Sequence, residues 1–188
     1  MTQEYKPLLR KKILSRRKSL SPTEFQEKNR QICDRIKNWE IFCGAKTVLA
    51  YFSFRQEPDL MPLITDKKRW GFPTCVSNDL NWHLWQPGEA LSIGKYGIKE
   101  PSDKEYPLPV TEVDLIIVPT VACDRLGYRL GYGGGYYDRL LTSSQWRHCP
   151  TLGVVFDFAY LDRLPKDDWD IKLQYICTEF SLDECFSV

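Results

Sequence analysis

A loop with five glycines is the stretch of this sequence that points most clearly to chemistry. It reads RLGYRLGYGGGYYDRLL over residues 125–141. Glycines lack a Cβ atom, so backbone N–H groups can face a ligand at close range, and a helix that begins near Gly135 would add the positive end of its dipole. The pattern therefore predicts a phosphate site. Asp138, just past the start of that helix, could hold a cation.

The loop matches neither of the two common phosphate-binding motifs. The GKS/T of a Walker loop is missing, and Gly131, Gly133 and Gly134 do not have the spacing of a dinucleotide-binding GxGxxG. On the residues alone, a loop that is merely flexible remains an alternative to a phosphate site.

Two basic residues near the N-terminus could supply positive charge to a phosphate. In KPLLRKKILSRRK, residues 6–18, Lys6 and Arg10 stand four apart, so a helix would place them on one edge. The usual role of such a run is a solvated charged face. A nucleic-acid-binding helix would carry aromatic residues between the basic ones, and residues 6–18 contain none. Taken alone, the solvated face is the preferred interpretation.

Catalysis by a side-chain nucleophile or by zinc finds little support. His83 and His148 are the only histidines, and neither has a cysteine, histidine or carboxylate at metal-ligand spacing. The seven cysteines contain no CxxC pair, and their odd number argues against a complete disulfide framework. We therefore expect reduced cysteines.

Helices and strands alternate along the chain in a way that would position the glycine loop. A helix is predicted over residues 6–18. A second helix begins at Ser21, where SPTE supplies an N-cap, a proline at the first helical position and Glu24 to close a capping box, and it ends at Gly44. A continuous apolar run predicts a doubly buried strand at 46–54. Further strands are predicted at 71–76, 80–85, 113–124, 151–157 and 175–179, the first two as a hairpin, with a short helix after Pro58.

The order of these elements predicts an α/β fold: an open, mostly parallel sheet flanked by helices, with residues 1–188 as a single domain. In such a sheet ligands bind beyond the carboxyl ends of the strands, where the glycine loop falls. The connection over residues 86–109 is rich in Gly, Pro and charged residues, and it is longer than a simple link between two elements requires. We therefore expect it to cover a site.

The composition excludes several classes of protein. Basic and acidic residues nearly balance, at 26 and 25, and 43% of residues are hydrophobic, which argues against disorder and against a polyanionic partner. No apolar run approaches the ~20 residues needed to span a bilayer, and the N-terminus lacks the apolar core of a signal peptide. We expect a cytoplasmic monomer that binds neither nucleic acid nor membrane.

Several segments together resemble the 5-formyltetrahydrofolate cyclo-ligase family. They are KPLLRKKILSRR, YFSFRQEPD, YGIKEP, DLIIVPTVACDRLGYRLGYGGGYYDRLL and DIKLQYICTE, and they cover nearly the whole chain in the expected order. The resemblance implies a fold similar to the ribose-5-phosphate isomerase and CoA-transferase group. It also implies ATP-dependent cyclisation of 5-formyltetrahydrofolate to 5,10-methenyltetrahydrofolate, with Mg²⁺, through a phosphorylated formyl (iminium phosphate) intermediate and with release of ADP and phosphate.

The resemblance further implies roles for individual residues. Those expected to bind ATP are Lys6, Arg10, Arg129, Gly131, Tyr132, Gly133, Gly134, Gly135, Tyr136 and Tyr137, of which Lys6, Arg10 and Arg129 would be catalytic. Those expected to bind the folate are Phe52, Glu57, Tyr96, Tyr132 and Tyr136. Asp138 and Asp170 would hold magnesium. The chain departs from the family pattern at Gln174, where a second acidic residue is expected.

Two other classes stay open from the residues. A phosphosugar isomerase or acyl-CoA transferase could share the sheet and the phosphate loop, but it would need a catalytic carboxylate or base and would not hydrolyse ATP. A nucleic-acid-binding module would use the basic helix and would bind with a steep salt dependence.

Overall fold

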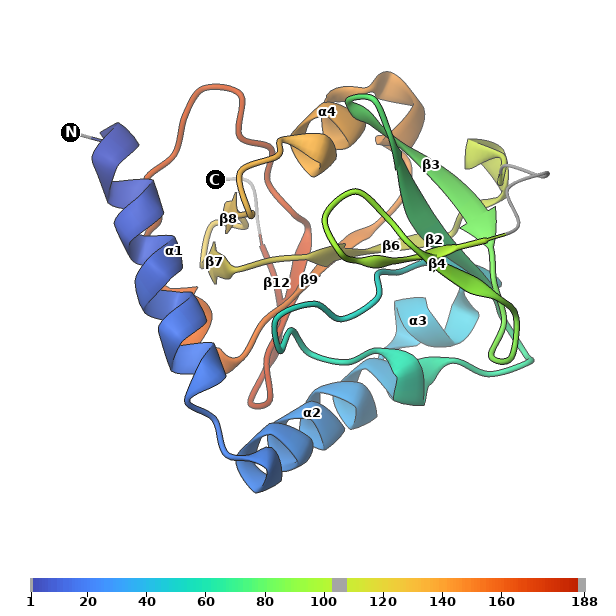
Figure 1. Cartoon of the computed structure of the whole chain (residues 1–188), viewed down its shortest axis with the longest axis horizontal. Coiled ribbons are helices and arrows are strands. Elements are labelled where there is room, and N and C mark those ends of the chain that lie inside the picture. The colour runs from blue at the N-terminus through green and yellow to red at the C-terminus, as the bar shows by residue number, and fades with distance from the viewer. Residues whose placement is uncertain (1, 103–107, 186–188) are drawn as a thin grey trace.

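The computed structural model describes residues 2–102 and 108–185, and a seven-stranded sheet forms its centre (Figure 1). The strand order is β12-β11-β9-β6-β1-β2-β3. The inner strands from β11 to β2 pair in parallel, while β3 and β12 are antiparallel edges. The strands are β1 Thr47–Leu49, β2 Arg69–Val76, β3 Asp79–Leu84, β6 Leu115–Pro119, β9 Thr151–Val154, β11 Tyr175–Cys177 and β12 Leu182–Glu184. The predicted open, mostly parallel sheet is confirmed.

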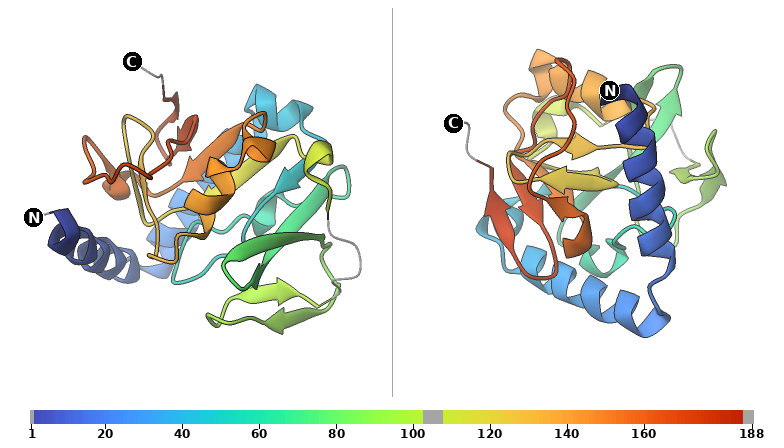
Figure 2. Two further views of the ribbon diagram at one scale, coloured as in Figure 1. Left: turned by 90° about the horizontal axis from the view of Figure 1, so that it is seen from above. Right: turned by 90° about the vertical axis from the view of Figure 1, so that its left-hand side faces the viewer.

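Helices cover both faces of this sheet (Figures 1 and 2). They are α1 Thr2–Lys18, α2 Pro22–Lys37, α3 Glu40–Gly44 and α4 Tyr136–Thr142. Successive residues of β6 explain the two cores: Leu115 and Ile117 pack in the cluster that contains α2 and α3 residues, whereas Ile116 and Val118 pack in the cluster that contains α1 and α4 residues. A strand buried on both faces must be apolar throughout, as this one is.

The second helix begins as predicted but ends earlier. The Ser21 hydroxyl accepts the Glu24 N–H at 3.2 Å and the Glu24 carboxylate accepts the Ser21 N–H at 2.9 Å, which completes the capping box. The expected single helix to Gly44 is wrong, because α2 stops at Lys37 and α3 follows. The Asn38 side chain donates to the Asp34 carbonyl at 2.8 Å, a local bond that competes with the helical ladder.

Two predicted strands are longer than the observed ones. The run 46–54 forms a strand only over β1, although the chain stays buried as far as Phe52. The run 113–124 is divided into β6 and β7 Ala122–Asp124, because the buried Thr120 hydroxyl donates to the Val154 carbonyl at 3.1 Å where the chain leaves the main sheet. An apolar run in the sequence therefore predicts which residues are buried more reliably than it predicts which residues pair in a sheet.

A small sheet that the sequence did not predict carries the glycine loop. It has the order β10-β7-β8, with β8 Arg129–Leu130 and β10 Tyr160–Leu161. Arg129 is therefore fixed in a strand, and the glycine loop leaves β8 and enters α4. Figure 2 shows α1 running alongside this small sheet.

The remaining connections are partly ordered by short elements. The predicted hairpin is confirmed as β2 and β3, and residues 86–102 contain another hairpin, β4 Leu91–Ile93 with β5 Lys99–Pro101. Residues 103–107 of the predicted long connection lie outside the described residues. Short 3₁₀ turns occupy Met61–Leu63, as expected after Pro58, and Val110–Glu112, Ser144–Trp146 and Asp157–Ala159. None of the helices in the described ranges is long and apolar enough to cross a bilayer.

Candidate active site

A cavity of about 480 Å³ lies beyond the carboxyl ends of β1 and β6. Its walls come from the chain after β1, the end of β6, the glycine loop, the start of α1, the β4–β5 hairpin and residues 167–170. Every residue that the sequence assigned to ATP, folate or magnesium lines this cavity. A second hollow of about 700 Å³, against α2 and β12, contains none of them. The structure thus brings the predicted residues together, while their individual roles remain predictions.

The glycine loop adopts a backbone that other residues disfavour. Gly133 has φ +103° and Gly135, the N-cap of α4, has φ +68°. A Cβ atom on Gly135 would lie 2.7 Å from an Arg139 guanidinium nitrogen. Since α4 has only seven residues, most of the positive charge at this end of the cavity comes from side chains rather than from the helix dipole.

Arg10 braces the glycine loop. Its Nε donates to the Gly131 carbonyl at 2.7 Å. Its guanidinium also lies beside Gly133, because a Cβ atom added to Gly133 would be 3.9 Å from the guanidinium carbon of Arg10. One nitrogen is thus used to hold the loop, and the side chain as a whole lines the cavity. The prediction that the basic helix is a solvated face is wrong for Lys6, Arg10 and Arg17. Lys6 and Arg10 line the cavity, and Arg17 is 1% exposed.

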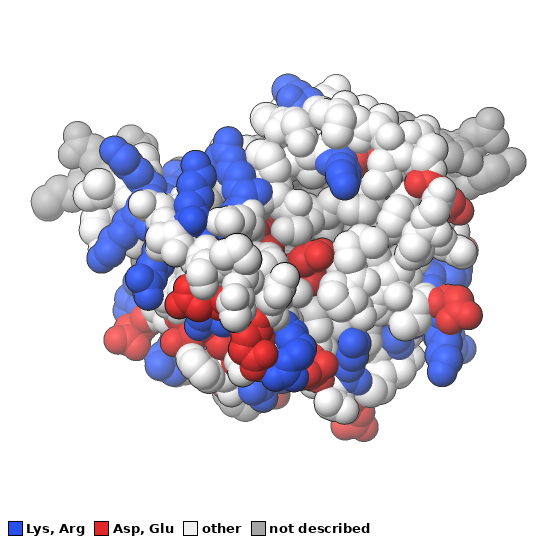
Figure 3. Space-filling model, turned by 60° about the horizontal axis from the view of Figure 1, so that its bottom comes forward, with Lys and Arg blue, Asp and Glu red and all other residues white. Residues whose placement is uncertain are grey.

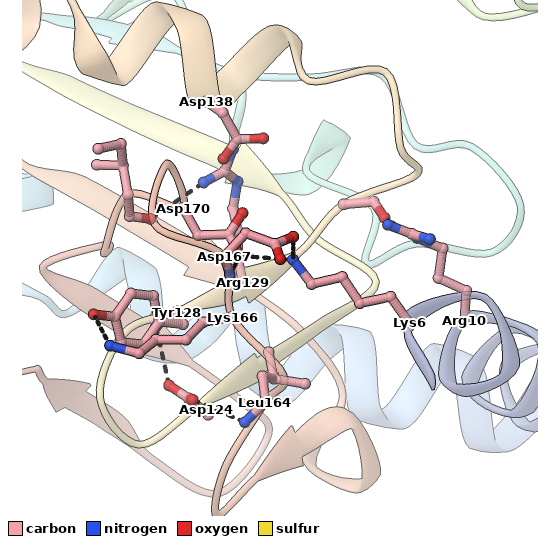
Figure 4. A network of polar contacts seen from close by, with 12 residues as sticks. Lys6, Arg10, Asp124, Tyr128, Arg129, Asp138, Leu164, Lys166, Asp167 and Asp170 are labelled. Carbon is pink, nitrogen blue, oxygen red and sulfur yellow. Dashed lines mark hydrogen bonds and ion pairs between the residues drawn. The ribbon is translucent and has the colours of Figure 1, made fainter. Parts of the chain in front are cut away.

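Each carboxylate predicted to hold magnesium is paired with a basic residue (Figure 4). Lys6 Nζ lies 2.6 Å from Asp167 and 2.7 Å from Asp170, and Arg129 donates to Asp138 at 2.7 Å. Burial lowers the pKa of Lys6, but its hydrogen bonds to the two aspartates outweigh this and raise the pKa overall. These paired basic and acidic groups therefore neutralise one another.

The donor set fits a magnesium ion that arrives with a nucleotide. In residues 2–102 and 108–185 no three His, Cys, Asp or Glu side chains are grouped to hold a metal by themselves. Mg²⁺ needs less, because it is commonly held by one or two carboxylates together with substrate phosphates. Asp138 and Asp170 meet that requirement. Gln174 lies outside the cavity, where its side chain accepts the Thr151 N–H at 3.1 Å and so supports the sheet.

Glu57 also lines the cavity and is buried, with only 2% of its surface exposed. One carboxylate oxygen, Oε2, accepts the Phe54 N–H at 3.0 Å, and the other, Oε1, has no hydrogen-bond partner among the described residues. Burial raises the pKa of Glu57 to about 7, against the opposing effect of the Arg17 charge. The Tyr137 hydroxyl on the same wall is also buried without a partner in the described structure. Unsatisfied polar atoms around a cavity indicate that a ligand completes their bonding.

Two of the four aromatic residues predicted to bind folate, Phe52 and Tyr96, differ in how deeply they are buried. Phe52 is 8% exposed and stacks on Phe72 with ring centroids 4.1 Å apart, so it contributes mainly to the floor. Tyr96, at the tip of the β4–β5 hairpin, has its hydroxyl 3.1 Å from that of Tyr136. The hairpin thus reaches across to the glycine loop, and the expectation that residues 86–109 cover a site is confirmed for the described part.

Several cavity residues were missed from the sequence. Asp167 and Trp169 belong to the acidic segment LPKDDWD, whose charge was visible but whose position over the cavity was not. That segment is held in place by the buried Asp124, which accepts the Leu164 N–H at 2.9 Å (Figure 4). It is also held by the Leu173 N–H, which donates to the Gly127 carbonyl at 2.8 Å.

Cys75 is the cysteine that lines the cavity, and it is a poor nucleophile. Burial, followed by the charge of Glu100, raises the pKa of its thiol, which therefore stays protonated near neutral pH. All seven cysteines are free, as expected.

The space-filling view in Figure 3 shows acidic and basic side chains interspersed over much of one face, with basic ones gathered towards the α1 end. The exposed basic residues of α1 are Lys11, Lys12, Arg16 and Lys18. Since Lys6, Arg10 and Arg17 turn inward, fewer charges of this helix remain for a polyanionic partner than the sequence suggested.

An open parallel sheet whose cavity is built from loops beyond the strand ends is typical of α/β enzymes. A model of the 5-formyltetrahydrofolate cyclo-ligase family matches residues 2–179. The chain belongs to that family, and so it is an enzyme of folate one-carbon metabolism.

Individual relatives agree with this assignment. The 5-formyltetrahydrofolate cyclo-ligase of Escherichia coli strain K12 is 35% identical over 88% of this chain and 96% of its own length. That of Mycolicibacterium smegmatis is 29% identical over 95% of each chain. The solved structure of Aquifex aeolicus 5,10-methenyltetrahydrofolate synthetase is 34% identical, with a TM-score of 0.85, and the match covers 97% of this chain and 94% of that one.

Proposed function

We propose that the enzyme uses ATP to convert 5-formyltetrahydrofolate to 5,10-methenyltetrahydrofolate through a phosphorylated formyl group. The observation that carries this proposal is that one cavity is lined by two kinds of binding group. Basic residues and the glycine loop are one kind, and the buried carboxylate of Glu57, with an unpaired oxygen, is the other. A nucleotide phosphate suits the first and the N–H donors of a pterin suit the second.

The chemistry needs activation because a formyl oxygen attached to an amide-like nitrogen is weakly nucleophilic and its carbon is weakly electrophilic. Transfer of the γ-phosphoryl group breaks its bond to ADP and forms a bond to the formyl oxygen. N10 of the folate then attacks the resulting iminium carbon, N10 loses its proton, and the carbon–oxygen bond to phosphate breaks. The products are 5,10-methenyltetrahydrofolate, ADP and phosphate.

The protein positions the reactants and neutralises charge in this scheme. Lys6, Arg10 and Arg129 contact the phosphates together with the amides of residues 131–137, and Glu57 holds the pterin. A magnesium ion held by Asp138, with Asp170 as a second candidate, would offset the charge of the transferring phosphoryl group. No side-chain nucleophile is required, which agrees with the protonated state of Cys75.

The proposal is tested by the growth in absorbance of the methenyl product from 5-formyltetrahydrofolate, with and without ATP, alongside a coupled assay for ADP. Product formation that needs ATP and yields one ADP per turnover supports it. Product formation at the same rate without ATP would overturn it. An ADP signal without methenyl product would indicate a different phosphoryl acceptor.

Replacing Arg10 by alanine is expected to raise the KM for ATP about tenfold, equivalent to ~1.4 kcal/mol, because the variant loses a phosphate-binding group and the brace on Gly131. The KM for the folate should change less than about twofold. Lys12→Ala, which removes an exposed charge from the same helix, is the matched control. Identical ATP kinetics in both variants would restore the solvated-face interpretation for Arg10.

A further inference from the structure

Arg17 is a buried basic residue that the proposed chemistry does not yet use. It lies on α1 with 1% of its surface exposed. A buried guanidinium is costly unless its donors and its charge are compensated, so a cation at this position indicates a specific role.

The contacts of Arg17 tie three segments together behind the cavity. One terminal nitrogen donates to the Tyr132 hydroxyl at 2.9 Å, and the other donates to the Thr120 carbonyl at 2.9 Å. Thr120 is the residue at which the chain leaves β6, and Tyr132 belongs to the glycine loop. Arg17 therefore fixes the side chain of Tyr132 against the end of the central strand.

Glu57 has no close counter-ion of its own in the described structure, since no ion pair involving it lies within 4 Å. Burial raises the pKa of Glu57, while the positive charge of Arg17 and the Phe54 N–H both lower it and so favour the ionised form. The other titratable groups that face Glu57 are Arg55 and Tyr51 from its own connection, Tyr132 from the glycine loop and Tyr137 from α4.

We propose that Arg17 is the positioning residue for the folate-binding part of the cavity, where it holds Tyr132 in place and supplies a buried positive charge. The inference rests on the proposed role of Glu57 and extends it to a residue that touches neither substrate. Burial favours the neutral carboxyl group of Glu57, and the charge of Arg17, which is itself buried, opposes this by lowering the pKa of Glu57.

The test measures binding of 5-formyltetrahydrofolate by calorimetry without ATP, between pH 6 and 9. Arg17→Met fills a similar volume without charge. It should weaken binding about tenfold at pH 7, and the loss should shrink as the pH rises, because Glu57 then ionises without help. Arg17→Lys keeps the charge and should restore most of the pH profile. Should Arg17→Met fail to give a folded protein, Arg17→Gln, which retains a donor but no charge, takes its place.

Arg16→Met is the matched control, since it removes the neighbouring arginine, which is exposed on the same helix. A pH profile for Arg17→Met that coincides with that of Arg16→Met would overturn the inference. So would an equal, pH-independent loss in Arg17→Met and Arg17→Lys, which would indicate a purely structural role.

A Glu57→Gln background separates this inference from the proposed function. If Glu57→Gln weakens folate binding, Arg17→Met should add no further pH-dependent loss in that background, and an undiminished loss would overturn the Arg17 inference. If Glu57→Gln binds folate like the parent at every pH, it is the proposed role of Glu57 that fails, and with it the reason for the Arg17 charge.

Discussion

Asp138→Asn is expected to lower kcat about 100-fold or more, or ~3 kcal/mol of transition-state stabilisation, while the protein stays folded. The substitution keeps an acceptor for Arg129, which donates to Asp138 at 2.7 Å, but removes the anionic oxygen that Mg²⁺ prefers. Steady-state kinetics over a range of magnesium concentrations provide the measurement. Excess magnesium should restore part of the rate, because the nucleotide phosphates retain the other ligands.

The control for Asp138 must separate loss of a metal ligand from loss of an ion pair. Asp162→Asn is suitable, since Asp162 pairs with Arg125 at 3.0 Å, is 91% exposed and lies outside the cavity. Thermal unfolding of both variants shows whether Arg129, which is 4% exposed, tolerates the neutral partner. Turnover equal to that of the parent at limiting magnesium would refute the metal assignment for Asp138.

The ion pairs that line the cavity would be rearranged by the ligands proposed to bind there. Lys6 is held by Asp167 and Asp170, and Arg129 by Asp138, so the proposed phosphate and metal would compete with these ion pairs. A phosphate that binds the basic residue of such a pair would free its carboxylate to bind the metal. A metal that binds the carboxylate would likewise free the basic residue to bind the phosphate. The two ligands should therefore bind more tightly together than either does alone.

Local signals in the sequence were sufficient for the elements that depend on local chemistry. The Ser21 and Glu24 capping box, the β2–β3 hairpin and the start of α4 after Gly135 all follow from short-range bonds or backbone preferences. The glycine loop and the basic pair Lys6 and Arg10 could also be recognised from the sequence, because glycine and basic residue types are typical of phosphate-binding sites.

Features that depend on distant contacts were not predictable from the sequence. The break after β6 depends on a bond from Thr120 to Val154, and the small sheet depends on pairing β7 with β10. Arg16 and Arg17 are neighbouring residues of the same type, yet Arg17 is buried against Tyr132 whereas Arg16 is exposed, because only Arg17 faces the sheet. Asp167 likewise gains its place over the cavity from the anchoring of its segment by Asp124.

The buried state of Glu57 changes what its substitution should do to stability. Its folded pKa, about 7, lies above the usual value of 4.5, so the folded protein binds more protons than the unfolded chain between those pH values. This group therefore makes the parent less stable as the pH rises from about 4.5 to 7. Glu57→Gln should be more stable than the parent at pH 8 by about 2–3 kcal/mol, and the difference should nearly vanish at pH 4.5. Urea unfolding at the two pH values provides the measurement.

The same substitution should impair the reaction even though it stabilises the fold. An ionised carboxylate can accept two neighbouring pterin N–H groups, whereas the amide of glutamine sets its own NH₂ against one of them. We expect kcat/KM for the folate to fall tenfold to a hundredfold, roughly 1.5–3 kcal/mol. In the parent, kcat/KM should rise with pH through about 7 as Glu57 ionises, and the variant should lose this dependence.

Nucleotide binding provides the internal control for Glu57. Affinity for ATP, measured without folate, should stay near the parent value because the hydrogen bond of Glu57 to Phe54 is separate from the ion pairs of Lys6 with Asp167 and Asp170. Unaltered folate kinetics together with weaker ATP binding would move Glu57 to the nucleotide site. The pterin pocket would then have to be sought at Phe52 and Tyr96, which line the same cavity.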